Sequence, residues 1–249
     1  MDIHKPKPFH GWREFLKEYG IIVLGVLTAL ALEQVVEKLH QLEQAKLAEH
    51  AMRLELGEDD GPQAYGRVVI SPCLDGRIAQ IHDAAETAPG DQLRAWAAAY
   101  APPFRSWDSE AWKAVASSNV GDFMGPERLI DWSAAYRILP GLTDSNASET
   151  ELLSELRDAT PAAGEPSAAD RHHLRELAGR LRNFNDRISR GSQLFLSRSR
   201  RLGVTVPEAM QQTLLKNARA IYGACVRAPD LNAPAAAERS TANLRGFTH

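Results

Sequence analysis

The chain has 249 residues, a formal net charge of -3 and the apolar and charged content of an ordinary globular protein. A chain of this length can bury a sizeable core, so folding does not require metals or several disulfides. The near-neutral charge argues against a bulk nucleic-acid binder. Two cysteines exclude a disulfide-rich scaffold and a zinc site of four thiolates, but they allow one bridge.

The segment YGIIVLGVLTALALEQVVEKLH, residues 19–40, carries no charge before Glu33. As a helix, residues 19–36 span about 27 Å, which matches the hydrocarbon thickness of a bilayer. Trp12 and Tyr19 lie at its near end, where amphipathic rings favour the headgroup region. The sequence therefore predicts a transmembrane helix over 19–36.

A cleaved export signal and a buried helix of a soluble protein are the two alternatives. Ala29-Leu30-Ala31 has the small-x-small form of a cleavage site. Against cleavage, the preceding region carries Glu14 and Glu18, and helix-forming residues run on without a Pro or Gly to Leu56. An uncleaved anchor is the favoured interpretation.

The flanking charges predict the orientation of this anchor. Lys5, Lys7, Arg13 and Lys17 precede the segment, whereas Glu33 is the first charge near its far end. Because Lys and Arg flanks stay in the cytoplasm, residues 1–18 are expected inside. In a bacterium this means a single-pass inner-membrane protein with a periplasmic C-terminal domain.

The run WREFLKEYGIIVLGVLTALALEQVVEKLH, residues 12–40, resembles the N-terminus of a group of uncharacterised proteobacterial single-pass membrane proteins. Their shared opening has the form W-x-E-F-L-x-E-x-G-I-I-V-L-G-V, followed by an E-Q pair. The resemblance implies a membrane anchor and a helical extracytoplasmic domain. It implies no activity, because none is known for the group.

A stripe of small residues runs along the predicted membrane helix. Gly25, Ala29 and Glu33 are spaced at i, i+4 and i+8, so two helices could approach closely and the carboxyl group could bond across them. We therefore expect a candidate dimer face here. The alternative is that Gly and Ala are simply common in membrane helices.

The helix is expected to continue as a stalk over 37–57 and to end at Gly57 and the acidic turn EDDGP, 58–62. Solvated carboxylates at a helix stop are the favoured interpretation of this turn. A calcium loop would need alternating oxygen ligands and a distant Glu, which the sequence lacks.

The domain over 58–226 is predicted to be all-α, an irregular antiparallel helical bundle, followed by a disordered tail over 227–249. Apolar spacing, Pro/Gly turns and capping residues predict a series of helices. They are a helix to about Glu86 kinked at Pro72, a short one at RAWAAAY, one after Asp108 or Ser109, one from Gly125-Pro126 to before Pro140, a 3-4 apolar seam from Leu174 to Phe195, and a last one from Pro207 to Cys225.

Residues that could carry chemistry are few. Trp107, Trp112 and Trp132 could form an aromatic cage, although core packing is the commoner use of aromatics at helical spacing. His172 and His173 are adjacent, unlike the i, i+4 pair of a zinc helix. Without a catalytic, phosphate-binding or dinucleotide motif, the sequence predicts no enzyme, cofactor, metal or small-molecule substrate.

Cys73 and Cys225 are the two cysteines. In an oxidising periplasm they could form a disulfide that ties an early helix to the last one. Two separately buried thiols are the alternative.

The seam helix also carries a basic face, with only Asp186 opposing it within the run. A solvated face is the default interpretation, and an anionic partner such as lipid headgroups or an acidic protein surface is the sharper one. The candidate residues are Arg180, Arg187, Arg190, Arg198 and Arg201.

Together these features predict a non-enzymatic envelope protein that acts through protein interaction or self-association, with the membrane as one partner. The alternative is a periplasmic ligand-sensing bundle that signals through a separate partner. A deep pocket along the bundle axis would favour the sensor, and a solid apolar core would favour the interaction module.

Overall fold

The structure is a computed structural model that describes residues 11–230. Every regular element within that range is helical, so the all-α prediction is confirmed. Lys5 and Lys7, and residues 231–249 of the predicted disordered tail, lie outside the described residues. The first three elements are α1 (Trp12–Leu54), the π-helical turn η1 (Glu55–Asp60) and α2 (Gly61–Ala84).

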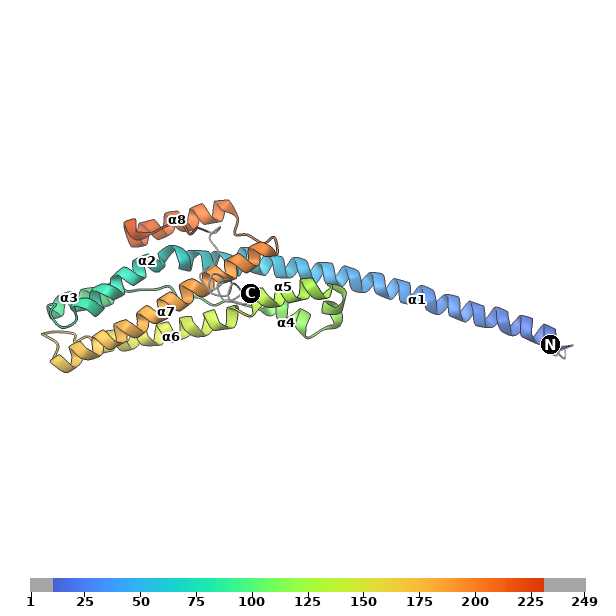
Figure 1. Cartoon of the computed structure of the whole chain (residues 1–249), viewed down its shortest axis with the longest axis horizontal. Helices are drawn as coiled ribbons and strands as arrows, with labels where there is room; N and C mark the ends of the chain where they lie inside the picture. Colours follow the sequence, from blue (N-terminus) through green and yellow to red (C-terminus); the bar gives the residue numbers. More distant parts are fainter. Residues whose placement is uncertain (1–10, 231–249) are drawn as a thin grey trace, which may run out of the picture.

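These three elements form one continuous helix of 73 residues, as Figure 1 shows. The expectation that Gly57 and the acidic turn end the stalk is therefore wrong. The amide of Gly61 donates to the Leu56 carbonyl across a wide π turn, and Pro62, which has no N–H to donate, occupies the first turn of α2. The expected solvated turn is also wrong for Asp60, which is buried.

The glycines in this turn serve packing. A Cβ at Gly57 would lie 3.3 Å from Val204, and one at Gly61 would lie 3.1 Å from Val206. Both valines are buried and follow the C-terminus of α7. The missing side chains let this later segment approach the helix closely, so tertiary packing overrides the local helix-stop signal.

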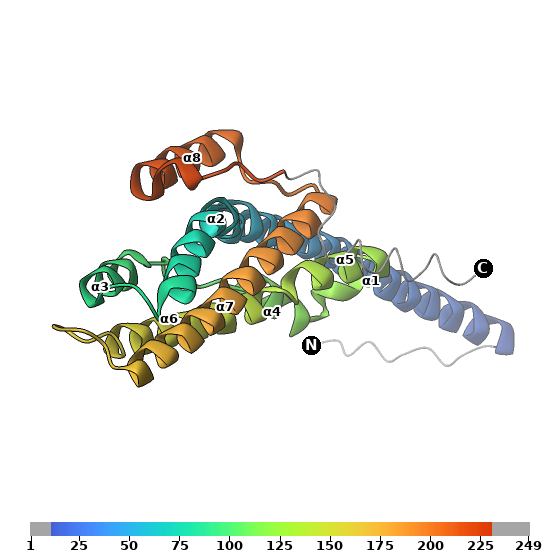
Figure 2. The ribbon, with the colours of Figure 1, turned by 60° about the vertical axis from the view of Figure 1, so that its left-hand side comes forward.

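Two long helices build the centre of the bundle. α2 packs along α7 (Ala168–Arg201), which in turn packs on α6 (Leu139–Asp158), as two views show (Figures 1 and 2). A capping box of Ser167 and Asp170 starts α7. Its apolar seam is buried as the 3-4 spacing predicts, at Leu174, Leu177, Leu181, Ile188 and Phe195, with Phe184 half-buried.

Shorter helices complete the domain. They are α3 (Gly90–Ala99), α4 (Glu110–Ala116), the 3-10 turn η2 (Asn119–Phe123), α5 (Pro126–Tyr136), α8 (Glu208–Tyr222) and the 3-10 turn η3 (Gly223–Cys225). The sequence pattern does not predict α6, because Pro140 was expected to close a helix. Instead α5 ends at Tyr136 and Pro140 lies in the first turn of α6, where proline is tolerated.

The N-terminal half of α1 projects away from the bundle (Figure 1). All its side chains from Trp12 to His40 are exposed except Val23, which is half-buried, and Ala45 is the first buried residue. At 1.5 Å per residue, this exposed stretch is about 43 Å long. The rest of the helix, from Ala45 to Ala84, belongs to the domain.

Replacing Gly61 by alanine should destabilise the domain by about 1–3 kcal/mol, since its Cβ would lie 2.5 Å from the Leu56 carbonyl oxygen. Gly76→Ala is the matched control in the same helix, because nothing lies within 4 Å of its Cβ. The control should stabilise by about 0.5–1 kcal/mol through helix propensity. Urea unfolding in mild detergent measures both, and equal effects would contradict a tight contact at Gly61.

Candidate functional site

One helix within residues 11–230 is long and apolar enough to cross a membrane, and the apolar window that qualifies it has no buried residue. Gly25, Ala29 and Glu33 are all exposed on it. A Cβ at Gly25 would meet nothing within 4 Å. The candidate dimer face is therefore open, and pairing through it stays a prediction.

A buried ion pair lies at the centre of the bundle. Arg67 on α2 donates from Nη1 and Nη2 to the two carboxylate oxygens of Glu149 on α6, at 2.8 and 2.6 Å. Both side chains are fully buried. This bidentate geometry pairs the two charges at a site closed to bulk solvent.

Polar side chains from α6, α7 and the end of α3 surround this pair. Asn185 accepts from Arg67 at 3.0 Å, and its amide nitrogen donates to the Ser71 carbonyl. Tyr100 donates its hydroxyl to Glu149 at 2.8 Å, and Asn146 donates to the other carboxylate oxygen at 3.4 Å. The network therefore connects three long helices through side-chain hydrogen bonds.

The environment changes the proton affinities of this cluster. Burial, followed by the neighbouring Glu149 carboxylate, raises the pKa of Tyr100 well above its usual range. Arg105 adjoins the cluster, since its backbone amide donates to Asn146, and burial and the positive charge of Arg67 lower the pKa of Arg105 to about 10. Arg67 and Glu149 are 0% exposed, so a ligand in solvent does not reach them directly. The geometry is that of a structural network.

Sequence reasoning missed this network. Arg67 and Glu149 are 82 residues apart, and each stands alone among ordinary helix residues. A usable signal is that Arg67 interrupts the otherwise apolar stretch around Val68, Val69 and Ile70. Even so, the partner carboxylate could not be chosen among the many Asp and Glu residues without the fold.

A surface groove of about 740 Å³ lies between α2 and α7 and reaches the edge of the network. Ser71 and Asn185, both buried, line it together with the ion pair of Asp75 and Arg182, whose closest atoms are 2.9 Å apart. Arg227, Ala228 and Pro229 line it from the C-terminal segment. The groove is polar and carries both signs of charge.

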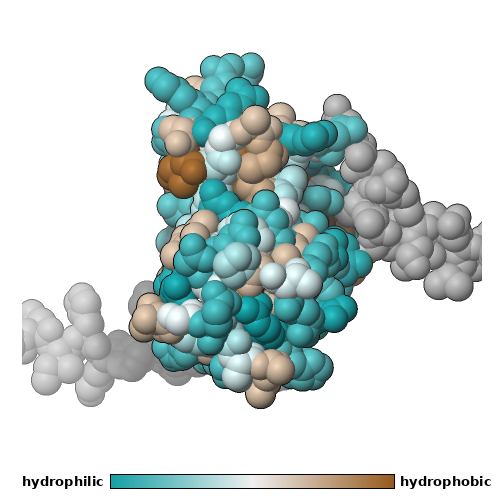
Figure 3. Space-filling model, turned by 90° about the vertical axis from the view of Figure 1, so that its left-hand side faces the viewer, coloured by the Kyte–Doolittle hydropathy of each residue, from teal (hydrophilic) through white to brown (hydrophobic). Residues whose placement is uncertain are grey.

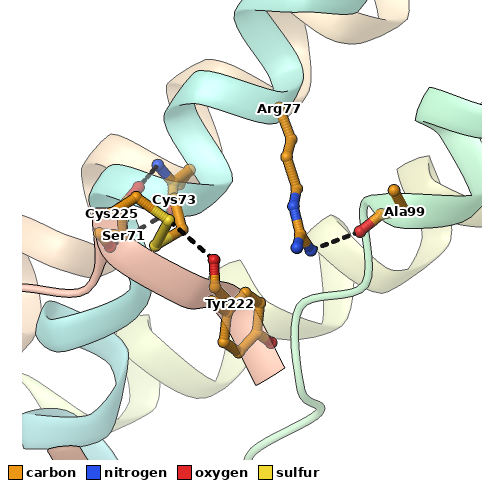
Figure 4. The surroundings of a disulfide bond; sticks show 7 residues. Ser71, Cys73, Arg77, Ala99, Tyr222 and Cys225 are labelled. Atoms are coloured by element: carbon orange, nitrogen blue, oxygen red, sulfur yellow. Dashed lines mark hydrogen bonds between the residues drawn. A yellow bond between two sulfur atoms is a disulfide. The ribbon is translucent and has the colours of Figure 1, made fainter. Parts of the chain in front are cut away.

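Cys73 and Cys225 form a disulfide in the structure, joining α2 to η3 (Figure 4). Cys225 lies just after α8, not within it as the sequence suggested. Nearby, Arg77 lies 5.0 Å from the Tyr222 ring centroid and donates to the Ala99 carbonyl. The disulfide therefore holds the C-terminal segment beside the groove.

The acidic residues of the π turn position α4. Asp60 accepts the Asp108 amide at 3.0 Å, and Glu55 accepts the amides of Glu110 and Ala111 at 2.8 and 3.2 Å. Burial raises the pKa of Asp60 to about 8, with a smaller contribution from the Glu55 charge. Within the described residues, no group of three or more His, Cys, Asp or Glu side chains could hold a metal ion.

The three tryptophans pack into the domain and do not line a cage. Trp132 and Trp107 are buried, and Trp112 is half-buried against the core. Trp112 stacks on Tyr136 with ring centroids 5.6 Å apart, and Trp132 lies 6.3 Å from the same ring. Core packing is therefore confirmed as their role.

The basic face is present on α7. On an ideal helix its five arginines fall within an arc of about 80°. Arg180 lies 3.6 Å from Glu155, Arg190 pairs with Asp186, and Arg187 lies 5.2 Å from the Phe184 ring centroid. Arg201 is exposed and Arg198 is half-buried. Carboxylates on the surface thus offset part of this charge, and an anionic partner stays a prediction.

Comparisons with protein-family models, curated proteins and solved structures give no match to this chain. Membership of the proteobacterial group that residues 12–40 resemble therefore stays a prediction.

Replacing Glu149 by glutamine should cost about 3–5 kcal/mol of unfolding free energy, because it leaves the buried Arg67 charge without a counter-ion. Glu155→Gln on the same helix is the matched control, since that carboxylate is half exposed, and it should change stability by less than about 0.5 kcal/mol. Urea unfolding followed by near-ultraviolet circular dichroism measures both. A loss for Glu149→Gln no larger than the control's would contradict an essential buried pair.

Replacing Asp60 by asparagine should remove a pH dependence of stability. Asp60 is protonated in the folded protein up to a pKa of about 8, whereas its carboxyl group in the unfolded chain ionises near 3.8. The wild type should therefore lose stability relative to Asp60→Asn as pH rises from about 4 to about 8, by up to about 1.4 kcal/mol per pH unit. Glu58→Gln, an exposed neighbour, is the control. Parallel pH profiles for wild type and Asp60→Asn would contradict the prediction.

Proposed function

We propose that this chain is a single-pass membrane protein whose helical domain works outside the cytoplasm as a non-enzymatic interaction module. The observation that carries the proposal is the continuous helix from Trp12 to Ala84. Its first part exposes an apolar surface, and its second part is the central helix of the domain. Anchor and domain are thus one rigid element.

The exposed apolar side chains need a non-aqueous neighbour. Ile21, Leu24, Leu27 and Leu30 are each about half exposed or more, in the range 49–66%. A continuous apolar surface of this length is far larger than a soluble monomer normally leaves in water. Lipid around residues 19–36 would remove it from water, which supports a membrane anchor.

Charge and chemistry support the proposed orientation. Arg13 and Lys17 lie before the span, as expected for a cytoplasmic N-terminus. The Cys73–Cys225 disulfide suits an oxidising compartment such as the bacterial periplasm. The end of the domain farthest from the N-terminus of α1 has a predominantly hydrophilic surface, as expected for a face in water (Figure 3).

The surface offers two ways to interact. The basic face of α7 fits an acidic partner surface, and the open stripe at Gly25 and Ala29 fits a second copy of the membrane helix. The ligand-sensing alternative has a weaker basis. The 740 Å³ groove lies at the surface between α2 and α7, while the interior is filled by the apolar core and the Arg67–Glu149 pair.

Chemical cross-linking in intact cells of the native host, followed by capture through a C-terminal tag and mass spectrometry, tests this proposal. We expect a stoichiometric envelope partner that is lost in Arg187→Gln/Arg198→Gln, because the change neutralises the basic face. Arg137→Gln/Lys216→Gln, which removes one positive charge just after α5 and one on α8, is the matched control and should keep the partner.

Other outcomes separate the parts of the proposal. Recovery of the chain alone, unchanged by the basic-face substitutions, would contradict an acidic partner. Cross-linked dimers that form in the wild type and are lost in Gly25→Leu would instead support self-association. Recovery of the wild-type chain with neither a partner nor a cross-linked dimer would favour a ligand sensor. Release of the protein from membranes by alkaline carbonate would contradict the anchor itself.

A further inference from the structure

The part of the domain nearest to the exposed half of α1 is the segment α4–η2–α5. It reaches farthest toward the N-terminal end of α1 in Figure 1, and η2 packs against that helix. Arg128 at the start of α5 also pairs with Glu49 on α1, which fixes the segment against the helix. This segment is the foot of the domain.

A groove of about 690 Å³ separates the tip of this foot from α1. Phe123, at the end of η2 and half-buried, lines one side. The other side comes from about three turns of α1. These residues are Leu30, Glu33, Gln34, Glu37, Lys38 and Gln41.

The level of this groove relative to the proposed span is the central observation. Leu30 lies six residues before Val36, which places it about 9 Å inside the outer end of a membrane helix over 19–36. The groove therefore extends from Leu30, about 9 Å inside the outer hydrocarbon boundary, to the headgroup level at Gln41. An aromatic side chain held there lies where aromatic rings favour the bilayer interface.

The chemistry of the lining changes along the same direction. The deep end is formed by the apolar side chain of Leu30. The outer part holds two carboxylates, Glu33 and Glu37, and one ammonium, Lys38, which forms no ion pair or hydrogen bond with another described residue. A zwitterionic phospholipid offers an apolar chain to Leu30, a phosphate to Lys38 and an ammonium to the carboxylate at nearly the same level, Glu37, whereas a purely anionic headgroup would meet the two carboxylates.

We infer that the foot rests on the outer leaflet and that the groove between Phe123 and α1 holds a zwitterionic phospholipid of that leaflet. The inference rests on the proposed membrane anchor. The acyl chain lies along Leu30, the phosphate meets Lys38, and the headgroup ammonium meets Glu37. The domain is thereby held at a fixed height and rotation on the membrane.

Spin-label accessibility in full-length protein reconstituted into phosphatidylethanolamine/phosphatidylcholine nanodiscs tests the inference. Because Cys73 and Cys225 are bridged, one introduced cysteine carries the nitroxide. Phe123→Cys and its neighbour Asp122→Cys are the test positions. Leu24→Cys reports the span, and Phe104→Cys, at a 66% exposed position beside α2, reports a site in water.

At both test positions we expect greater access to oxygen than to a polar nickel complex, at a depth between the two reference labels. Lys38→Gln should shift the label at position 122 toward the water value, because the phosphate contact is lost. Labels at 122 and 123 that match position 104, while Leu24→Cys reports deep burial, would overturn the inference and leave the anchor intact. A water-like signal at Leu24→Cys as well would overturn the proposed function.

Equal depth in nanodiscs of purely anionic phospholipid would overturn the headgroup preference. Circular dichroism of each labelled protein, compared with the wild type, shows whether the domain has kept its fold. Because Asp122 is exposed, its label gives a valid readout even where replacement of the half-buried Phe123 disturbs η2.

Discussion

The continuity of the helix through η1 is the constraint on which the rest of the structure depends. A helix that stopped at Gly57 would leave a hinge between the N-terminal part of α1 and the domain. The π turn instead keeps both parts on one continuous helix. The turn is held from two sides. Glu55 and Asp60 accept backbone amides at the start of α4, and Val204 and Val206 pack into the space left by Gly57 and Gly61.

The same two contacts connect the turn to distant parts of the domain. Through α4 the turn positions the foot, which continues into η2 and α5. Through Val204 it meets the segment that follows α7, and α7 packs along α2. Any tilt of α1 in a membrane would therefore be carried into the bundle as a rigid movement, because no flexible linker lies between them.

Inside the bundle, directional bonds supplement apolar packing. Leucine and isoleucine side chains on α2, α6 and α7 could slide past one another at small energetic cost, but the bidentate contact of Arg67 with Glu149 holds only in one register. The Cys73–Cys225 disulfide adds a covalent connection between α2 and η3. Both features suit a domain whose surface, and not a moving interior, carries its interactions.

Local patterns in the sequence were sufficient for the all-α class, the exposed apolar stretch in α1, the buried seam of α7 and the packing role of the tryptophans. Each depends on the period of a helix or on residue type, which neighbouring residues determine. Tertiary structure decided the rest. Pro62 and Pro140 lie in helical first turns, where the helix needs no N–H donor from them, and Arg67 finds Glu149 across 82 residues. The groove that Phe123 and α1 line together likewise exists only after folding, because no periodicity relates residues so far apart in the chain.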